Sequence, residues 1–263
     1  MSDHEQLKIS IIGTGRVATH LALHLHQQNQ KIQYIFNRSV EKAQVLADQV
    51  HATAIDDLAQ INDTDILLIC VSDSAITQIS EKLSQINYQG LVAHTSGSTA
   101  LSVLSNLGRN AGVFYPLQTF SFEQKIDWQS TPIFIEAKSV DALHKLEIFA
   151  ENFSSKIYQY NSEQRLSLHL AAVFACNFSN YCYDIAQQIL DEKQVDVDLL
   201  QPLIDATAEK LKRARAVENQ TGPAVRHDQQ ILAMHQLMLT NHTEWQTIYQ
   251  LMSQGIQART PKN

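Results

Sequence analysis

The 263-residue sequence predicts an α/β protein, in which a doubly wound, mostly parallel sheet is followed by an all-α C-terminal domain. Three observations lead to this fold class. A short apolar run near the N-terminus ends in a glycine-rich turn that opens a helical pattern. Strand-like and helix-like segments then alternate as far as residue 160, which is typical of parallel strands joined by helices. Beyond Asn161 the strand pattern stops and long helical segments follow.

The glycine-rich turn is the strongest local signal in the chain. The apolar run 9–12 indicates a buried strand, and it is followed directly by Gly13-Thr14-Gly15-Arg16-Val17-Ala18. In a dinucleotide-binding βαβ unit, the first glycine makes the tight turn and the second lets a pyrophosphate approach the helix N-terminus. The sequence therefore predicts a cofactor-binding turn made by Gly13, Thr14, Gly15, Arg16 and Val17. The alternative is a glycine turn before an ordinary helix.

The end of the second strand, 32–36, bears on the choice of cofactor. An acidic residue about 20 positions after the glycines would hold the ribose 2′-hydroxyl of NAD. Here the neutral Asn37 is followed by Arg38 and Ser39, which offer a cation and a hydroxyl group to a 2′-phosphate. The sequence therefore favours NADP, with these three residues in the cofactor site. The alternative is that Arg38 is a surface charge and Ser39 only caps the helix that begins at Val40.

The remaining elements of the first domain continue the alternation. A helix is expected at 41–50 and a short strand at 52–55, and the apolar run 65–71 indicates a parallel strand buried on both faces. Further strands are expected at 91–94, 113–115, 132–136 and 156–160, with a helix at 140–153. Because ligands of such sheets bind at the carboxyl ends of the strands, we expect the crevice to be lined by Val71, Ser72 and Asp73.

Two later strand ends supply candidates for catalysis and substrate binding. His94 and Ser96 follow one strand, and a histidine with an ordinary pKa of about 6.5 can transfer a proton at neutral pH. Tyr115 and Gln118 follow the next strand and are expected to contact substrate. The alternatives are that His94 is a buried histidine held by backbone hydrogen bonds, that Ser96 shapes a loop of donor groups, and that Tyr115 and Gln118 anchor a loop.

The chain after Asn161 is expected to be helical over 163–193, 198–216, 229–239 and 243–257. Pro223 is suited to the first turn of a new helix, because its missing N–H is not needed there. We therefore predict a dinucleotide-binding domain, 1–160, and a helical substrate or dimerisation domain, 161–263. Arg226 and Asp228 open the new helix. Arg226 is a candidate ligand for a substrate carboxylate, and the alternative is that the two residues form a cap and an ion pair.

Composition and charge disfavour several other classes of protein. The formal net charge of −7 argues against nucleic-acid binding, which needs a clustered basic surface. No apolar run approaches the roughly 18 residues of a membrane helix, and residues 1–6 lack the features of a signal peptide. His20 and His24 are expected on the solvated face of the first helix, so no metal site is predicted. The three cysteines are Cys70, Cys176 and Cys182, and their spacing indicates neither a disulfide framework nor a metal site. These features favour a cytoplasmic protein.

Five short motifs carry a resemblance to known proteins. They are Gly13-Thr14-Gly15-Arg16-Val17-Ala18, His94-Thr95-Ser96-Gly97, Tyr115-Pro116-Leu117-Gln118-Thr119-Phe120, the run from His169 to Asn177, and Thr221-Gly222-Pro223 with Arg226 and Asp228. With them the chain resembles an uncharacterised family of NADP oxidoreductases that joins a Rossmann-like domain to a helical domain of unknown function. More distantly, it is similar to pyrroline-5-carboxylate reductase, prephenate dehydrogenase and 6-phosphogluconate dehydrogenase-like proteins.

The resemblance implies an NADP-dependent enzyme that dimerises through its C-terminal helices. The related 3-hydroxyacid dehydrogenases carry Lys-x-x-x-Asn on the first long helix of the second domain, with the lysine as proton donor. Here Val173 takes the lysine position before Asn177, and a valine cannot transfer a proton. His169, four residues earlier, is expected on the same face and is the candidate substitute. The alternative is that His169 and Asn177 are hydrogen-bonded residues at a contact between the domains.

Taken together, the motifs predict an NADP-dependent oxidoreductase that transfers a hydride to or from a small, carboxylated metabolite. The metabolite is expected to be an imine or a keto or hydroxy acid. Imine reduction needs less acid catalysis than ketone reduction, and the sequence offers few obvious acid–base residues. The alternative is a catalytically silent NADP-binding protein that senses the cofactor or scaffolds a partner.

Overall fold

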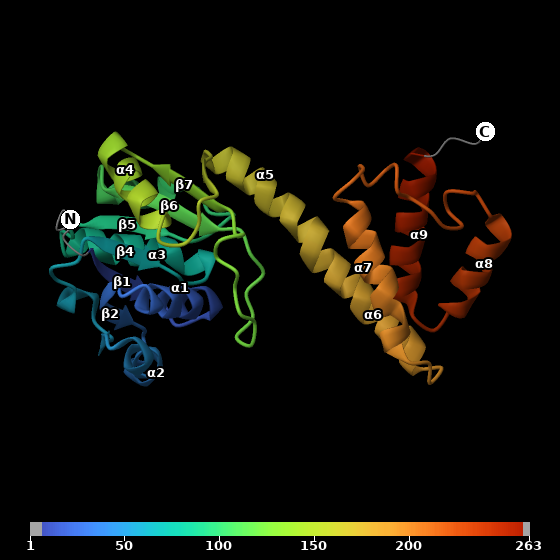
Figure 1. The fold of residues 1–263 in the computed structure, drawn as a ribbon, viewed down its shortest axis with the longest axis horizontal. Coiled ribbons are helices and arrows are strands. Elements are labelled where there is room, and N and C mark those ends of the chain that lie inside the picture. Colours follow the sequence, from blue (N-terminus) through green and yellow to red (C-terminus); the bar gives the residue numbers. More distant parts are fainter. Residues whose placement is uncertain (1–6, 260–263) are drawn as a thin grey trace. The chain divides into compact units, whose positions relative to one another are not determined.

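A computed structural model describes residues 7–259 of the chain (Figure 1). The N-terminal residues 1–6, which lack signal-peptide features in the sequence, lie outside the described part. The chain divides into two compact units, one ending at Cys176 and the other beginning at Asn177. The last strand is β8 (Ile157–Gln159), and the helix that follows it is α5 (Ser162–Ala172). Because the first unit ends at Cys176, it includes α5. A functional domain boundary at residue 160 stays a prediction.

The first unit is built on one eight-stranded sheet with the order β3-β2-β1-β4-β5-β6-β7-β8. Its other strands are β1 (Lys8–Ile12), β2 (Lys31–Phe36), β3 (Thr53–Ile55), β4 (Ile66–Ile69), β5 (Leu91–His94), β6 (Ala111–Pro116) and β7 (Ile133–Ala137). Only the β6–β7 pair is antiparallel, so the predicted doubly wound, mostly parallel sheet is confirmed. The order reverses direction between β1 and β4, which is where such sheets open a crevice.

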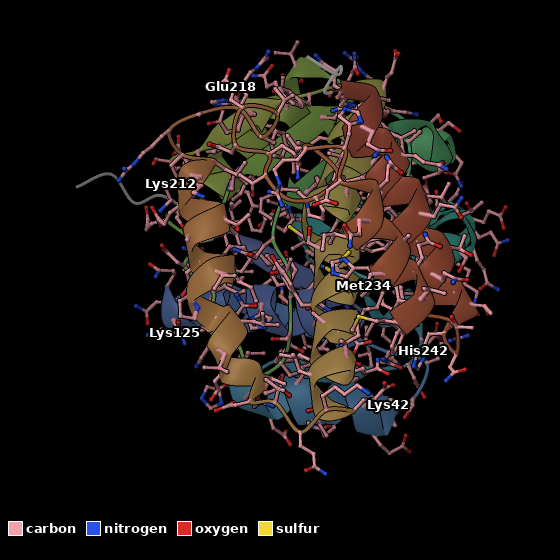
Figure 2. The ribbon with its side chains drawn as sticks, turned by 90° about the vertical axis from the view of Figure 1, so that its right-hand side faces the viewer. Lys42, Lys125, Lys212, Glu218, Met234 and His242 are labelled. Carbon is pink, nitrogen blue, oxygen red and sulfur yellow. The ribbon has the colours of Figure 1, made fainter. Side chains whose placement is uncertain are left out.

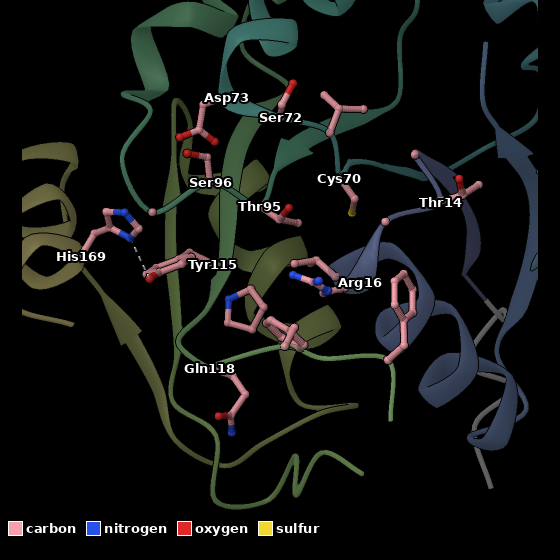
Figure 3. A pocket seen from close by; sticks show the side chains of 18 of the residues that line it. Thr14, Arg16, Cys70, Ser72, Asp73, Thr95, Ser96, Tyr115, Gln118 and His169 are labelled. Atoms are coloured by element: carbon pink, nitrogen blue, oxygen red, sulfur yellow. Dashed lines mark hydrogen bonds between the residues drawn. The ribbon is translucent and has the colours of Figure 1, made fainter. Parts of the chain in front are cut away.

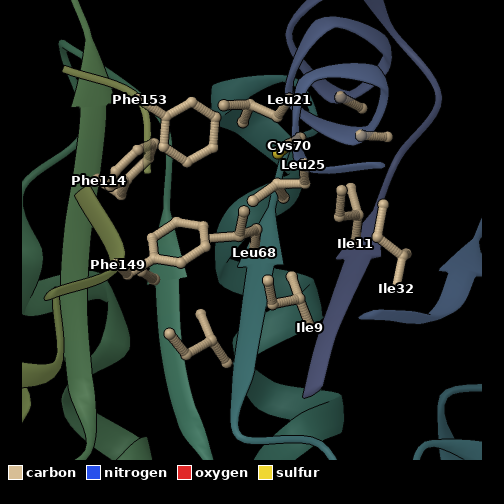
Figure 4. Close-up of a cluster of buried hydrophobic side chains, with 14 of the residues drawn as sticks. Ile9, Ile11, Leu21, Leu25, Ile32, Leu68, Cys70, Phe114, Phe149 and Phe153 are labelled. Atoms are coloured by element: carbon tan, nitrogen blue, oxygen red, sulfur yellow. The ribbon is translucent and has the colours of Figure 1, made fainter. Parts of the chain in front are cut away.

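The helices of the first unit cover both faces of the sheet. They are α1 (Arg16–Gln27), α2 (Val40–Val50), α3 (Asp73–Gln85) and α4 (Val140–Ala150). Along β4, Leu68 packs into the cluster formed with α1, α2 and α4, whereas Leu67 and Ile69 pack into the cluster formed with α3. Figure 4 shows the first cluster, in which Phe149 of α4 lies beside Leu68. Burial on both faces explains why the β4 segment is almost entirely apolar.

The second unit is helical, with α6 (Ser179–Asp191), α7 (Gln201–Lys210), α8 (Gln229–Met238) and α9 (Thr243–Arg259). The helix expected over 198–216 is wrong at its end, because α7 stops at Lys210. Pro223 does not begin a helix either: it lies in a turn that follows Gly222, whose φ is +107°. Asp228 caps α8 by accepting a hydrogen bond from the Ile231 N–H at 3.2 Å. No described helix is long and apolar enough to cross a membrane.

The connection between α5 and α6 contains a π-helix, Val173–Phe178, which the sequence analysis did not predict. A π-helix inserts an extra residue into the helical turn, and such turns often occur at functional sites. The shared face that the sequence predicts for Val173 and Asn177 stays a prediction, because this segment has π-helical rather than α-helical geometry.

Candidate functional site

The first unit contains a cavity of about 710 Å³ at the carboxyl ends of its parallel strands (Figure 3). Most of the predicted cofactor residues line it: Gly13, Thr14, Gly15, Arg16, Val17, Asn37, Val71, Ser72 and Asp73. Ser96, Tyr115, Gln118 and His169 line it as well. Figure 3 shows Thr14 on the side opposite Asp73, Ser96 and His169, with the Arg16 side chain between them. The cavity therefore has two chemically different ends.

The glycine turn is adapted to close backbone packing. Gly13 has a φ of +113°, and a Cβ atom there would lie 2.2 Å from the carbonyl oxygen of Cys70. Its N–H donates to the carbonyl of Phe36 at 2.8 Å, which joins β1 to the end of β2. A Cβ atom on Gly15 would meet no atom within 4 Å, so this residue opens the approach to α1. Any side chain at Gly13 requires the backbone at Cys70, directly after β4, to move.

The N-terminus of α1 is left available for an anion. Its N-cap, Gly15, has no side chain to satisfy the first N–H groups, and the first turn contains no acidic residue. Free N–H groups and the helix dipole together favour a phosphate at such a position. Arg16 adds a cation, and its guanidinium carbon lies 5.8 Å from the centre of the Phe122 ring. These residues fit the diphosphate of a dinucleotide.

The end of β2 has a built hydrogen-bond arrangement. Asn37 donates from Nδ2 to Thr14 Oγ1 at 2.7 Å and accepts the Ser39 N–H at 3.1 Å. Ser39 caps α2 by accepting from the Lys42 N–H at 3.4 Å, as its alternative interpretation predicted. Arg38 is exposed and has no partner among the described residues. Arg38 and Ser39 lie next to the cavity lining in sequence but are not part of it.

His94 does not face the cavity, so its expected placement is wrong. It is fully buried, and its Nδ1 accepts the Ser96 N–H at 3.2 Å, which is the alternative that the sequence left open. Burial, assisted by the nearby Arg165 guanidinium, lowers the pKa of His94 to about 4. A strand-end side chain can point toward the crevice or behind it, and the strand pattern alone does not decide which.

Ser96 lines the cavity, but its hydroxyl group is engaged in the loop. Its Oγ accepts the N–H groups of Ser98 and Thr99, at 3.2 and 2.9 Å, and donates to Thr99 Oγ1 at 2.9 Å. The neighbouring Ser98 hydroxyl donates to the Asp73 carboxylate at the start of α3. These bonds hold the loop between β5 and β6 against α3, which is the loop-shaping alternative for Ser96.

Tyr115 and His169 meet at one end of the cavity, although 54 residues separate them. The Tyr115 hydroxyl lies 3.4 Å from His169 Nδ1, and the dashed line in Figure 3 marks this contact. Both rings pack against the backbone of Gly97, where a Cβ atom would lie 2.6 Å from Tyr115 and 2.8 Å from His169. Burial raises the pKa of Tyr115 to about 12, with a smaller opposing effect from Arg165.

A buried arginine behind this pair was missed by the sequence analysis. Arg165 of α5 is 1% exposed and forms an ion pair with Glu136 of β7. It also donates to the Thr99 carbonyl at 2.5 Å and to the Ser162 hydroxyl at 3.3 Å. Arg165 lies four residues before His169, so helical spacing, which places the two residues on one face of α5, was the one sequence signal that could have indicated it. Arg165 therefore ties α5 to the sheet and to the loop that carries Ser96.

The other predicted site residues are distributed differently. Gln118 lines the cavity, but its amide bonds to Thr131 and to the Thr119 N–H, so it anchors the loop after β6. Asn177 and Arg226 belong to the second unit and are not among the residues that line this cavity. No ion pair joins Arg226 to Asp228 in the described part of the chain. The roles of these residues stay predictions.

Two histidines of α1 bind to other segments of the first unit, so their expected solvated face is wrong. His20 Nε2 lies 2.7 Å from the Ser121 carbonyl oxygen, and His24 Nε2 lies 2.8 Å from that of Asn152. The His24 ring packs on Trp128 and Phe153. Among residues 7–259, no three side chains of metal-binding type form a cluster.

Comparisons with known proteins agree with this architecture. Residues 131–256 match the domain of unknown function DUF2520, and residues 1–92 match shikimate / quinate 5-dehydrogenase. The structure is similar to that of a "putative NADP oxidoreductase" from Bacteroides fragilis, at 37% identity and a TM-score of 0.87, covering 97% of this chain and 99% of that one. The chain belongs to the same family. Its resemblance to NADP oxidoreductases with a C-terminal domain of unknown function is thereby confirmed.

More distant structures share the fold of this chain. A protein from Thermotoga maritima has 22% identity and a TM-score of 0.70, covering 96% of this chain and 98% of that one. A reductive aminase from Aspergillus terreus, in complex with NADPH and ethyl-5-oxohexanoate, has 16% identity and a TM-score of 0.65, with 94% and 88% covered. Comparison with curated proteins gives no match.

Proposed function

We propose that the protein binds NADP(H) and transfers a hydride to or from a C=N or C=O group of a small metabolite. The observation that carries this proposal is the N-terminus of α1, which follows Gly13 and Gly15 and has no side-chain cap. It lies at the edge of a cavity large enough for a nicotinamide ring and a substrate. Membership of a family that includes a named NADP oxidoreductase adds support.

In this proposal the diphosphate binds the N–H groups at Gly15 and Arg16, and the 2′-phosphate binds beside Ser39. Arg38 is the cation for the 2′-phosphate, because its guanidinium is exposed and unpaired and follows directly after Asn37. Asn37 itself is occupied by Thr14 and Ser39, so it orients the turn and leaves no carboxylate to repel the phosphate.

Bound NADPH would supply the hydride, and the protein's part is to orient the substrate and hold protons. The Tyr115 hydroxyl stays protonated at neutral pH, because burial raises its pKa to about 12. His169 Nδ1 lies 3.4 Å from that hydroxyl and orients it. The pair is therefore the candidate source of a hydrogen bond to the substrate. A carboxylated substrate would need Arg226, which lies in the second unit.

The proposal also includes a homodimer formed through the helical unit. Among its described apolar side chains, only Ala224, Leu232 and Leu239 are buried. Large apolar side chains on α7, α8 and α9 stay exposed, and Met234 of α8, labelled in Figure 2, is 46% exposed. Exposed apolar surface of this kind commonly marks a protein interface.

The test is a titration of the protein with NADPH and NADH, followed by the fluorescence of the reduced nicotinamide. We expect NADPH to bind more tightly than NADH. Gly13→Ala should abolish binding of both, because the added methyl group collides with the Cys70 carbonyl. A protein that binds neither nucleotide at millimolar concentration would refute the proposal. Binding without reduction of any compound in a broad panel of imines and keto acids would favour the silent sensor instead.

Arg38→Ala should weaken NADPH binding about tenfold and leave NADH binding nearly unchanged, since it removes one charge-assisted contact to the 2′-phosphate. The matched control is Arg109→Ala, because Arg109 is also exposed but precedes β6 at the opposite end of the strands. An equal loss for the two nucleotides in Arg38→Ala would contradict the 2′-phosphate assignment.

A further inference from the structure

Two charged side chains of opposite sign line the cavity. Arg16, at the start of α1, lies between Thr14 and Tyr115 in Figure 3, whereas Asp73, at the start of α3, lies apart from it, near Ser96. No other Asp, Glu, Lys or Arg of the described residues lines it. Once the diphosphate has engaged Arg16 and the α1 N-terminus, the cavity keeps one fixed charge, the carboxylate of Asp73.

We propose that the substrate of this site is a cation at its reacting group, a protonated imine or the corresponding amine, and that the Asp73 carboxylate is its counterion. This inference rests on the proposed function and chooses between the C=N and C=O substrates that it leaves open. The Asp73 carboxylate accepts the Ser98 hydroxyl and is otherwise exposed at the cavity, so it keeps lone pairs for a ligand N–H.

The buried cation of this unit does not reverse the sign beside Asp73. The Arg165 guanidinium is paired with Glu136 and bonded to the Thr99 carbonyl, and it does not line the cavity. A substrate carboxylate placed beside Asp73 would meet a like charge without a free cation from this unit to compensate it. An iminium or ammonium group meets an opposite charge at the same place.

The supply of protons in the cavity points to the same substrate class. Reduction of a ketone places negative charge on oxygen, so an acid must deliver a proton. Reduction of an iminium ion moves the C=N electron pair onto nitrogen and gives a neutral amine, with the hydride supplied by NADPH and no further proton needed. His94 lies behind the cavity wall, the Ser96 hydroxyl is engaged in its loop, and burial makes Tyr115 a weaker acid than usual. The remaining group is His169, whose Nδ1 lies 3.4 Å from the Tyr115 hydroxyl rather than being free to face a substrate.

The experiment measures binding by calorimetry to the full-length protein saturated with NADP⁺. The probes are pyrrolidine, a cation at neutral pH, tetrahydrofuran, a neutral ring of the same size, and cyclopentanecarboxylate, an anion. We expect pyrrolidine to bind about tenfold more tightly than tetrahydrofuran, and the carboxylate most weakly. In Asp73→Asn the preference for pyrrolidine over tetrahydrofuran should disappear.

Two variants separate the charge from its surroundings. Ser98→Ala removes the hydrogen bond to Asp73 but keeps the carboxylate, so the preference for pyrrolidine should remain. Glu81→Gln removes the same charge from an exposed position near the other end of α3, and it should also keep the preference.

Several outcomes would overturn the inference. They are equal binding of pyrrolidine and tetrahydrofuran, no binding of pyrrolidine, tightest binding of the carboxylate, or a preference that survives in Asp73→Asn. If Asp73→Asn weakens NADP⁺ binding and leaves the preference intact, Asp73 is a cofactor contact, and the inference also fails. The NADP(H)-binding part of the proposed function stands in all these cases, because NADP⁺ binds the wild-type protein, and its hydride-transfer part is tested separately by the panel of imines and keto acids. If saturation with NADP⁺ cannot be reached, the proposed function fails, and the inference fails with it.

Discussion

The two units of this chain bury their apolar side chains to very different extents. In the sheet unit, strands and helices enclose two continuous apolar clusters, one on each face. In the helical unit, the helices carry many Leu, Met and Tyr residues, but most of these side chains remain exposed. Because apolar burial is the main stabilising term in folding, the first unit supplies its own core, whereas the second requires a covering surface. The homodimer proposed above would provide that surface.

The largest effect is expected from truncating the core of the sheet unit. Phe149 is fully buried against Phe114 and Phe153, so Phe149→Ala should lower the free energy of unfolding by about 3–5 kcal/mol. Leu237 of α8 is 75% exposed, and Leu237→Ala should change the free energy of unfolding by less than about 0.5 kcal/mol in dilute protein. Urea denaturation of both variants measures the difference. Similar losses would contradict the contrast between the units.

A smaller effect is expected from the pH dependence of the sheet unit. The pKa of His94 is about 4 in the folded protein, below its ordinary value near 6.5, because burial disfavours the charged ring. Between pH 4 and pH 6.5 the unfolded chain therefore binds more protons at His94 than the folded protein does. The contribution of His94 to the free energy of unfolding is fully present above pH 6.5 and is lost as the pH falls toward 4. The loss should be up to about 3 kcal/mol.

Urea unfolding of the wild type and of His94→Gln between pH 4 and pH 7.5 measures this loss. The variant cannot titrate at position 94, so its stability should depend less steeply on pH. His169→Gln is the control, because that ring lines the cavity and is not fully buried. If the wild type and His94→Gln show parallel curves, the assignment of the acid sensitivity to His94 is wrong.

The smallest effect concerns the covering surface. Leu203 of α7 is 62% exposed in the single chain, and Leu203→Asp should weaken the proposed dimer about tenfold by placing a charge in an apolar contact. Val45 of α2, in the sheet unit, is 66% exposed, and Val45→Asp should leave the dimer intact. Light scattering over a dilution series distinguishes them. A wild-type protein that is monomeric at every concentration would refute the dimer.

The sequence predicted most of the sheet because its signals are local. Apolar runs such as that of β4 and the glycine turn after β1 specify elements within a few residues, and a positive φ at Gly13 needs no distant information. The helical unit was predicted less well at its ends. The π-helix at Val173–Phe178 leaves no mark in the apolar pattern, so the sequence analysis did not predict it.

The sequence predicted the residues that line the cavity at the glycine turn, but it predicted only some of the residues proposed for catalysis and substrate binding. Residues of the α1 turn follow from one motif, whereas the direction of His94 depends on which side of the strand end the loop takes. Arg165 was missed because a charged residue on an amphipathic helix normally indicates a solvated face. Only the position of Glu136, 29 residues earlier in the chain, makes its burial favourable.

By itself, the sequence determined the order of the elements, the doubly wound class and the place of the first helix N-terminus, since these depend on residues adjacent in the chain. The tertiary structure alone decided that Tyr115 meets His169 over Gly97, that Arg165 pairs with Glu136, and that Asp73 and Arg16 line one cavity. Such pairings arise where segments far apart in sequence pack together. Their partners are set by the geometry of the whole sheet rather than by local preference.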